Sequence, residues 1–250
     1  MSRIISTLVA LLSLSAPMGP LRAAEVNVAV AANFAAPMQK IAQAFEQETG
    51  HKAVLSVGST GHFYAQIRNG APFQILLAAD NETPVKIANE GLGVAASRFT
   101  YAIGRLVVWS KQPGLVDDKG DILRSGQFQR IAIANPKLAP YGAAALQAMT
   151  QLGLVQALQP KWVQGENIAQ TYQFIATENA PLGFVALSQV MANGKITHGS
   201  AWTVPSHLHA PLQQDAILLT KGIDNPAASA LLHFLRSDRT KMLIRSYGYS

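Results

Sequence analysis

Short apolar runs alternate with helical segments through the first third of the chain, and this alternation restricts the possible folds strongly. One helical segment carries Met38, Ile41, Ala42 and Phe45 on one face and ends at Gly50. Strands rich in β-branched residues that alternate with helices predict a parallel sheet covered by helices. The chain is therefore predicted to be an α/β protein, with strands and helices in turn at 26–32, 35–50, 53–56, 62–68 and 75–79.

The same alternation continues to the end of the 250 residues, and no Pro-, Gly- or Ser-rich linker divides them. If the chain forms two lobes, strands that cross from one to the other must join them. The apolar run 99–110 predicts such a crossing strand, and Gly104 within it can absorb a hinge rotation. Further strands are expected at 105–110, 131–134, 183–186 and 216–220, and helices at 142–152, 168–177, 187–193, 226–236 and 240–246.

The first 24 residues predict an exported protein. They combine a basic start, an apolar middle and a small-residue end, so we expect a signal peptide over 1–24 with cleavage after Ala23 or Ala24. The apolar run is too short to span a bilayer. The chain contains no cysteine, which excludes disulfides, thiolate catalysis, Cys-ligated zinc and a lipoprotein anchor.

The basic residues are scattered along the chain. The formal charge is +6, but no block of Lys and Arg produces it. Because a nucleic-acid-binding protein usually gathers its charge on one face or helix, the sequence does not predict a nucleic-acid partner.

Polar or small residues stand where four predicted strands end and helices begin. The first turn of a helix has unpaired N–H groups and a positive dipole end, so several such ends that meet form an anion site without formal charge. In open α/β sheets, ligands lie beyond the carboxyl ends of the strands. The four junctions are 30–35, 58–63, 134–144 and 165–170.

Each junction also has a simpler interpretation. Asn33 and Asn167 are ordinary N-cap residues, and Ser59 or Thr60 can cap the helix that follows. Tyr141, at a helix start, can simply pack against a neighbouring loop. Capping is the commoner role for any one of them, so the prediction of an anion site depends on all four junctions together.

Other candidate sites are weaker. His207 and His209 have no nearby carboxylates and are expected in a surface strand or loop rather than at a metal. A hydrolase using His62 and Asp80 is an alternative, but no nucleophile elbow accompanies them, and Asp80 is expected to begin a helix. The glycine-rich loop also lacks the lysine of a P-loop. We therefore expect a binding protein, not an enzyme.

From Val26 to Tyr249, the chain resembles the periplasmic molybdate-binding proteins of ABC importers, which are type II periplasmic binding proteins. The pattern G-S-T-G-x-x-Y-A-Q-I-x-x-G-A-P-F at 58–73 is specific in combination. The resemblance also rests on 31-AANFAAPMQKIAQAF-45, 97-SRFTYAIGRLVVWS-110, 131-IAIANPKLAPYGAAA-145, 165-GENIAQ-170 and 181-PLGFVALSQV-190.

This resemblance implies two Rossmann-like α/β lobes joined by two crossing strands. Lobe 1 would hold residues 25–103 and 217–250, and lobe 2 residues 104–216. The lobes would close on a tetrahedral oxyanion held by Ala32, Asn33, Ser59, Thr60, Tyr141 and the backbone N–H of Ile168.

Two positions depart from other members of the family. Ala186 stands where some members have a ligand-binding tyrosine, and the resemblance implies that Tyr141 supplies that hydroxyl from another loop. Asn33 replaces a serine, so an amide would donate in place of a hydroxyl.

The resemblance implies a monomeric periplasmic protein that delivers molybdate, and tungstate, to the membrane permease of an ABC importer. No cofactor and no direct metal ligand are expected, because the same donors hold the whole oxyanion. A binding protein of the same fold for sulfate or another small anion is the alternative. A small carboxylate is less well suited, because none of the four junctions has an arginine for bidentate capture.

Overall fold

The computed structural model describes residues 23–192 and 194–250. The predicted signal peptide therefore lies almost wholly outside the described residues. Within them, no helix combines the length and the apolar composition needed to cross a membrane.

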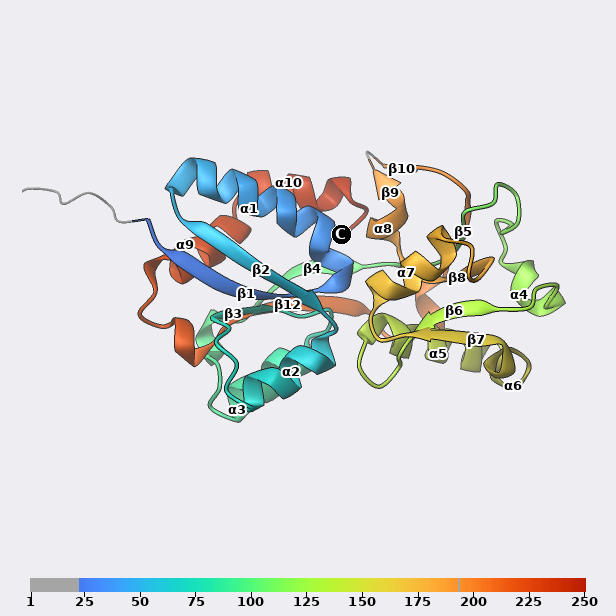
Figure 1. The fold of residues 1–250 in the computed structure, drawn as a ribbon, viewed down its shortest axis with the longest axis horizontal. Helices are drawn as coiled ribbons and strands as arrows, with labels where there is room; N and C mark the ends of the chain where they lie inside the picture. Colours follow the sequence, from blue (N-terminus) through green and yellow to red (C-terminus); the bar gives the residue numbers. More distant parts are fainter. Residues whose placement is uncertain (1–22, 193) are drawn as a thin grey trace, which may run out of the picture.

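The structure has two lobes, each built on a five-stranded sheet (Figure 1). In the first sheet, β1, β2 and β3 are parallel, and β12 runs antiparallel to β3 and β4. Its order is β2 (Lys52–Gly58), β1 (Glu25–Ala31), β3 (Ile75–Leu77), β12 (Leu212–Leu218) and β4 (Phe99–Gly104).

The second sheet repeats this mixed design. Here β6 is parallel to β7 and β8, whereas β5 is antiparallel to β8 and β11. The order is β11 (Ser200–Thr203), β5 (Leu106–Ser110), β8 (Leu182–Ala186), β6 (Ile131–Ala134) and β7 (Trp162–Gly165). The predicted fold class, two α/β lobes, is confirmed.

Helices cover both faces of the first sheet. Strand β1 alternates between the two faces: Val28 packs with Met38 and Phe45 of α1, whereas Ala29 packs with Phe63 of α2. One face carries α1 (Ala35–Thr49), α9 (Pro226–Leu235) and α10 (Asp238–Ser246), and the other carries α2 (Thr60–Arg68) and α3 (Glu82–Asn89) (Figure 1).

The second sheet is likewise buried on both sides. Ile133 packs with Ala145 of α5, and the neighbouring Ala132 packs on the opposite face with Ile175 of α7. The helices of this lobe are α4 (Asp121–Ser125), α5 (Pro140–Gln151), α6 (Val155–Leu158), α7 (Ile168–Ala176) and α8 (Leu187–Val190), followed by the short strands β9 (Met191–Ala192) and β10 (Lys195–Ile196). Short 3-10 turns complete the two lobes: η1 (Ala32–Phe34), η2 (Ala95–Ser97), η3 (Gln159–Lys161), η4 (Ser206–Leu208) and η5 (Thr220–Gly222).

Two connections join the lobes. Strands β4 and β5 follow one another with only Arg105 between them, and the chain returns from β11 to β12 through η4. All of β12 pairs in the first sheet, so the chain re-enters lobe 1 at Leu212, five residues before the expected boundary at 217.

Two predicted element ranges differ from the structure by more than two residues at one end. Strand β12 starts at Leu212, whereas the predicted start was 216. The prediction was wrong because the first half of the strand carries polar residues, including the buried Gln214 and Asp215, that do not show a strand pattern. Helix α8 ends at Val190 rather than 193, because the chain continues into β9.

Candidate functional site

Strand ends from both lobes meet around one small cavity. All six residues predicted to bind the ligand line it. The lining residues are Ala31, Ala32, Asn33, Gly58, Ser59, Thr60 and Ala79 from lobe 1, and Ala139, Pro140, Tyr141, Asn167 and Ile168 from lobe 2.

Ser59 provides the clearest sign that this cavity is built for a ligand. Its side chain is buried, and its Oγ has no hydrogen-bond partner among the described residues. Ser59 occupies the N-cap position of α2 but makes no side-chain capping bond. Because an unpaired buried hydroxyl lowers stability, a hydroxyl kept in this state indicates a partner that the protein itself does not supply.

The hydroxyl of Thr60 is available as a hydrogen-bond donor in the same cavity. Its Oγ1 is buried and accepts a hydrogen bond from the Ala79 N–H at 3.0 Å. This bond uses an oxygen lone pair and leaves the O–H available as a donor. The capping interpretation therefore fails for both Ser59 and Thr60.

The start of α7 offers a backbone donor from the opposite lobe. Asn167 is an N-cap, as expected, and its Oδ1 accepts from the N–H groups of Ala169 and Gln170 at 2.9 and 3.0 Å. The N–H of Ile168, at the first helical position, has no acceptor within the helix. It is therefore left for a ligand in the cavity.

The side-chain amide of Asn33 was expected to donate to the ligand, and the structure differs on this point. Both side-chain donors are already used, since its Nδ2 donates to Gln214 Oε1 at 2.8 Å and to Tyr249 Oη at 3.0 Å. The side-chain amide is therefore not free to bind an anion. What Asn33 offers the cavity is its backbone in η1, immediately after β1.

Tyr141 is buried in the cavity wall at the start of α5. Its hydroxyl accepts a hydrogen bond from Gln214 Nε2 at 3.1 Å. Burial, followed by the nearby Tyr249 hydroxyl, raises the pKa of Tyr141 well above its usual value, so the phenol keeps its proton. Ala186, the other position considered, lies at the end of β8 and is not among the residues that line the cavity.

The lining is neutral. Among the described residues that form the cavity wall there is no lysine, arginine, histidine, aspartate or glutamate. Backbone N–H groups and the hydroxyls of Ser59 and Thr60 are the donors that this wall offers, whereas the Tyr141 hydroxyl is paired with Gln214.

Direct contacts hold the lobes closed over the cavity. The Gly61 N–H donates to the Leu138 carbonyl oxygen at 2.9 Å, and Ser188 Oγ donates to the Asn33 carbonyl oxygen at 2.8 Å. A Cβ on Gly61 would lie only 3.0 Å from the Leu138 backbone. The glycine therefore serves the approach of the two lobes rather than the approach of a ligand.

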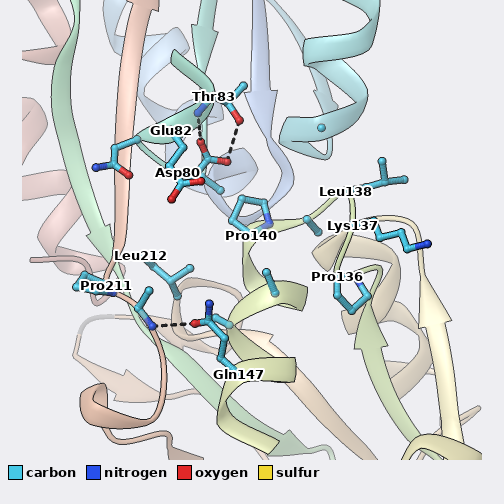
Figure 2. A pocket seen from close by; sticks show the side chains of 17 residues that line it. Asp80, Glu82, Thr83, Pro136, Lys137, Leu138, Pro140, Gln147, Pro211 and Leu212 are labelled. Atoms are coloured by element: carbon cyan, nitrogen blue, oxygen red, sulfur yellow. Dashed lines mark hydrogen bonds between the residues drawn. The ribbon is translucent and has the colours of Figure 1, made fainter. Parts of the chain in front are cut away.

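A larger groove between the lobes lies beside the cavity, and Figure 2 shows its lining. Asp80 accepts from the Thr83 N–H and Oγ1 at 2.7 and 3.2 Å, so its predicted role at the start of a helix is confirmed. Burial raises its pKa above the usual value. His62 is exposed on α2, and its ring makes no hydrogen bond to Asp80. The groove therefore gives no support to the hydrolase alternative.

The histidine pair lies at the surface, as expected. His207 is exposed in η4, and His209 is partly exposed just after it. Within the described ranges, no group of three or more His, Asp or Glu side chains is placed to hold a metal ion.

A buried polar cluster at the hinge was not predicted from the sequence. It consists of Asn33, Tyr101, Tyr141, Ser188, Gln214 and Tyr249, which we call the hinge cluster. These residues come from both lobes and from distant parts of the chain. Gln214 stands in the polar half of β12, beside Gln213 and Asp215, so the local sequence pattern gave no signal of its burial.

Comparison with known proteins agrees with this geometry. Residues 26–250 match the family model of the bacterial extracellular solute-binding proteins. The molybdate-binding protein ModA of Azotobacter vinelandii is 58% identical over 228 residues, which cover 91% of this chain and 90% of the relative. The protein of the same name from Rhodobacter capsulatus is 49% identical over 230 residues, with coverage of 92% and 90%.

Solved structures show the same architecture. The periplasmic molybdate-binding protein of Azotobacter vinelandii superposes with a TM-score of 0.86 at 39% identity, covering 90% of this chain and 98% of that one. The sulfate-binding protein SubI of Mycobacterium tuberculosis shares the fold, with a TM-score of 0.73 at 12% identity, covering 90% of this chain and 86% of that one. This chain therefore belongs to the bacterial extracellular solute-binding proteins, in the family that contains the molybdate-binding proteins.

Proposed function

We propose that this protein captures molybdate, and also tungstate, in the cavity between its lobes and delivers the oxyanion to the permease of an ABC importer. The unpaired buried hydroxyl of Ser59 is the observation that carries the proposal. The names of the close relatives support the choice of ligand. As a member of an extracellular family, the protein is exported, and we place it in the periplasm as a monomer.

The chemistry of the wall suits a fully deprotonated dianion. Such an ion has only acceptor oxygens, and the wall offers the Ser59 and Thr60 hydroxyls and the Ile168 N–H as donors. Monoprotonated phosphate carries a proton and needs an acceptor, which a wall of donors serves poorly. The helix starts at Thr60 and Ile168 add positive dipole ends from opposite lobes.

Neutral donors also leave the ion releasable. They bind without forming an ion pair, and pre-aligned donors lose little entropy when the ligand arrives. A ligand favours the closed form only to the extent that it binds that form more tightly. Because donors from both lobes contact the same ion, binding would favour closure, and the closed form would be the one that the permease recognises.

Titration calorimetry tests the proposal. The purified protein is titrated separately with molybdate, tungstate, sulfate and phosphate, and its melting temperature is recorded with each anion. We expect dissociation constants of about 1 μM or lower for molybdate and tungstate and much weaker binding of phosphate. Tight binding of sulfate alone would favour the alternative ligand. The absence of any response to the four anions would refute the proposal.

A further inference from the structure

The first turn of α7 leaves one backbone donor for the cavity. The N–H groups of Ala169 and Gln170 are taken up by Asn167 Oδ1. The Thr171 N–H donates to the Asn167 carbonyl oxygen at 3.1 Å. The Ile168 N–H has no acceptor within the helix, and Ile168 lines the cavity. The contribution of α7 to anion binding therefore depends on the direction of this one N–H.

The direction of the Ile168 N–H is tied to the carbonyl group of the same peptide unit. A trans peptide is planar, and its C=O and N–H groups point in opposite directions. The carbonyl of this unit belongs to Asn167, and it accepts from the Thr171 N–H and from Thr171 Oγ1, the latter at 2.9 Å. Because both bonds hold the carbonyl along α7, the Ile168 N–H points out of the helix start, where the cavity lies.

The Thr171 hydroxyl is closely packed in this position. The side chain is fully buried, and its bond to the Asn167 carbonyl is the one hydrogen bond that Oγ1 makes to the described residues. A Cβ on Gly165 would lie 2.8 Å from Thr171 Oγ1 and 3.2 Å from the Asn167 carbonyl oxygen. The end of β7 therefore packs directly against the bond that orients the peptide unit.

Gln189 holds the next peptide unit from outside the helix. Its Nε2 donates to the Ile168 carbonyl oxygen at 3.0 Å, and its Oε1 accepts from the Ala186 N–H at 2.9 Å. A carbonyl can only accept and an N–H can only donate, so the orientation of the Gln189 amide is determined by its two neighbours. This side chain therefore ties the start of α7 to the end of β8.

We propose that Thr171 and Gln189 are positioning residues of the anion site: they hold the peptide units on both sides of Ile168, so that its N–H is aimed at the bound oxyanion. Neither side chain lines the cavity, so both act through the Ile168 backbone. The bonds to the Asn167 carbonyl also polarise the peptide unit, which makes its N–H a stronger donor. This inference rests on the proposed function, since it concerns binding of the same anion.

Titration calorimetry with molybdate tests the role of Thr171. Thr171→Val keeps the shape of the side chain and removes the hydroxyl, and we expect affinity to fall about three- to fivefold. The melting temperature of the ligand-free protein should change little, because the backbone N–H at this position still bonds to the Asn167 carbonyl. Thr171→Ser restores the hydroxyl and should return affinity to within about twofold of the wild type.

Thr177 provides a matched control at the other end of the same helix. Its Oγ1 donates to the Gln173 carbonyl oxygen at 2.7 Å, which is the same type of bond as that of Thr171, but neither Thr177 nor Gln173 lines the cavity. Thr177→Val should therefore leave affinity within about twofold. Equal losses in Thr171→Val and Thr177→Val would show a general effect on the helix and would overturn the role of Thr171.

Gln189→Met tests the second residue, and it keeps the inference testable even if Thr171→Val does not fold. It removes both bonds of the amide, so we expect an affinity loss of about fivefold. The control is Gln170→Met. Gln170 is exposed at the same helix start, and its Oε1 accepts from the Glu166 N–H at 2.7 Å. Its replacement should leave affinity within about twofold, and a loss equal to that of Gln189→Met would overturn the role of Gln189.

The amide resonance of Ile168 reports the positioning directly. In nitrogen–proton correlation spectra, we expect molybdate to shift the Ile168 amide proton downfield in the wild type and in both controls, and to shift it less in Thr171→Val and Gln189→Met. Wild-type affinity or a wild-type shift in either variant would overturn the role of that residue while leaving the proposed function intact. A wild-type protein that binds no molybdate or tungstate would overturn both.

Discussion

The anion cavity and the hinge cluster are both sets of buried polar groups, but the groups of the hinge cluster are paired with one another whereas the cavity contains an unpaired hydroxyl. In the hinge cluster, the Tyr249 hydroxyl accepts from Asn33 Nδ2 and lies 2.8 and 2.9 Å from the Asn33 carbonyl oxygen and Ser188 Oγ. In the cavity, Ser59 Oγ is buried without a partner among the described residues. Paired groups fix the structure, whereas donors left unpaired are available to a ligand.

This contrast predicts that polar substitutions near the hinge lower stability or shift lobe closure, and that those in the cavity remove a direct contact to the ligand. The largest effect is expected for Arg98→Met. The side chain of Asp215 is completely buried and receives bonds from Arg98 and from Thr100 Oγ1. Removing the arginine leaves a buried carboxylate without its cationic partner, which should lower the free energy of unfolding by about 3 kcal/mol.

Chemical denaturation measures this loss. The control is Arg68→Met, which removes an exposed pair with Glu90 at 3.6 Å and should cost about 0.5 kcal/mol or less. Equal effects of the two variants would show that the Asp215 pair is no more important than a surface contact.

Ser59→Ala is expected to lower affinity without lowering stability. Loss of the hydroxyl should weaken molybdate binding by about 1–3 kcal/mol, because the anion loses a buried donor. The stability of the ligand-free protein should not fall, since an unpaired polar group is removed. Calorimetry and melting curves on the same sample report the two quantities, and lower stability with unchanged affinity would contradict the assignment.

Ser188→Ala sharpens the comparison, because Ser188 is a buried serine whose hydroxyl is paired. Its Oγ donates across the lobes to the Asn33 carbonyl oxygen. Removing this bond should favour the open form and weaken binding by about 1 kcal/mol. Small-angle scattering with and without molybdate would detect the shift. If Ser188→Ala reduced affinity more than Ser59→Ala, the distinction between the two regions would not hold.

The smallest effect concerns pH. Burial raises the pKa values of Tyr101 and Tyr141 well above the usual value of 10.0. The stability that these neutral phenols contribute is complete below the unfolded-state pKa and is lost as the pH rises above it. The melting temperature should therefore stay nearly constant between about pH 7 and about pH 9 and fall only above about pH 10, while molybdate affinity should not change between about pH 7 and about pH 9. A transition near neutral pH would point to another titrating group.

Much of the fold could be predicted from local patterns. Apolar spacing located α1, and Gly50 at its end adopts a left-handed conformation with φ of 72°, as a C-cap glycine should. Strand β6 was predicted with its observed bounds, because its short run of buried apolar residues lies between polar segments. Strand β12 was misplaced because Gln214 and Asp215 are buried by long-range partners that local pattern cannot reveal.

For the site too, some features could be predicted from local sequence and others could not. The sequence by itself determined that Ser59, Thr60, Tyr141 and Ile168 stand at strand-to-helix junctions, because caps, glycines and strand ends are local features. Only the tertiary structure decided which donors are free. The side-chain amide of Asn33 donates to Gln214 and Tyr249, which lie 181 and 216 positions away in the chain. The Ser59 hydroxyl, in contrast, has no partner among the described residues. Hydrogen-bond partners depend on which distant segments pack together, and that information lies in the fold rather than in any local stretch of sequence.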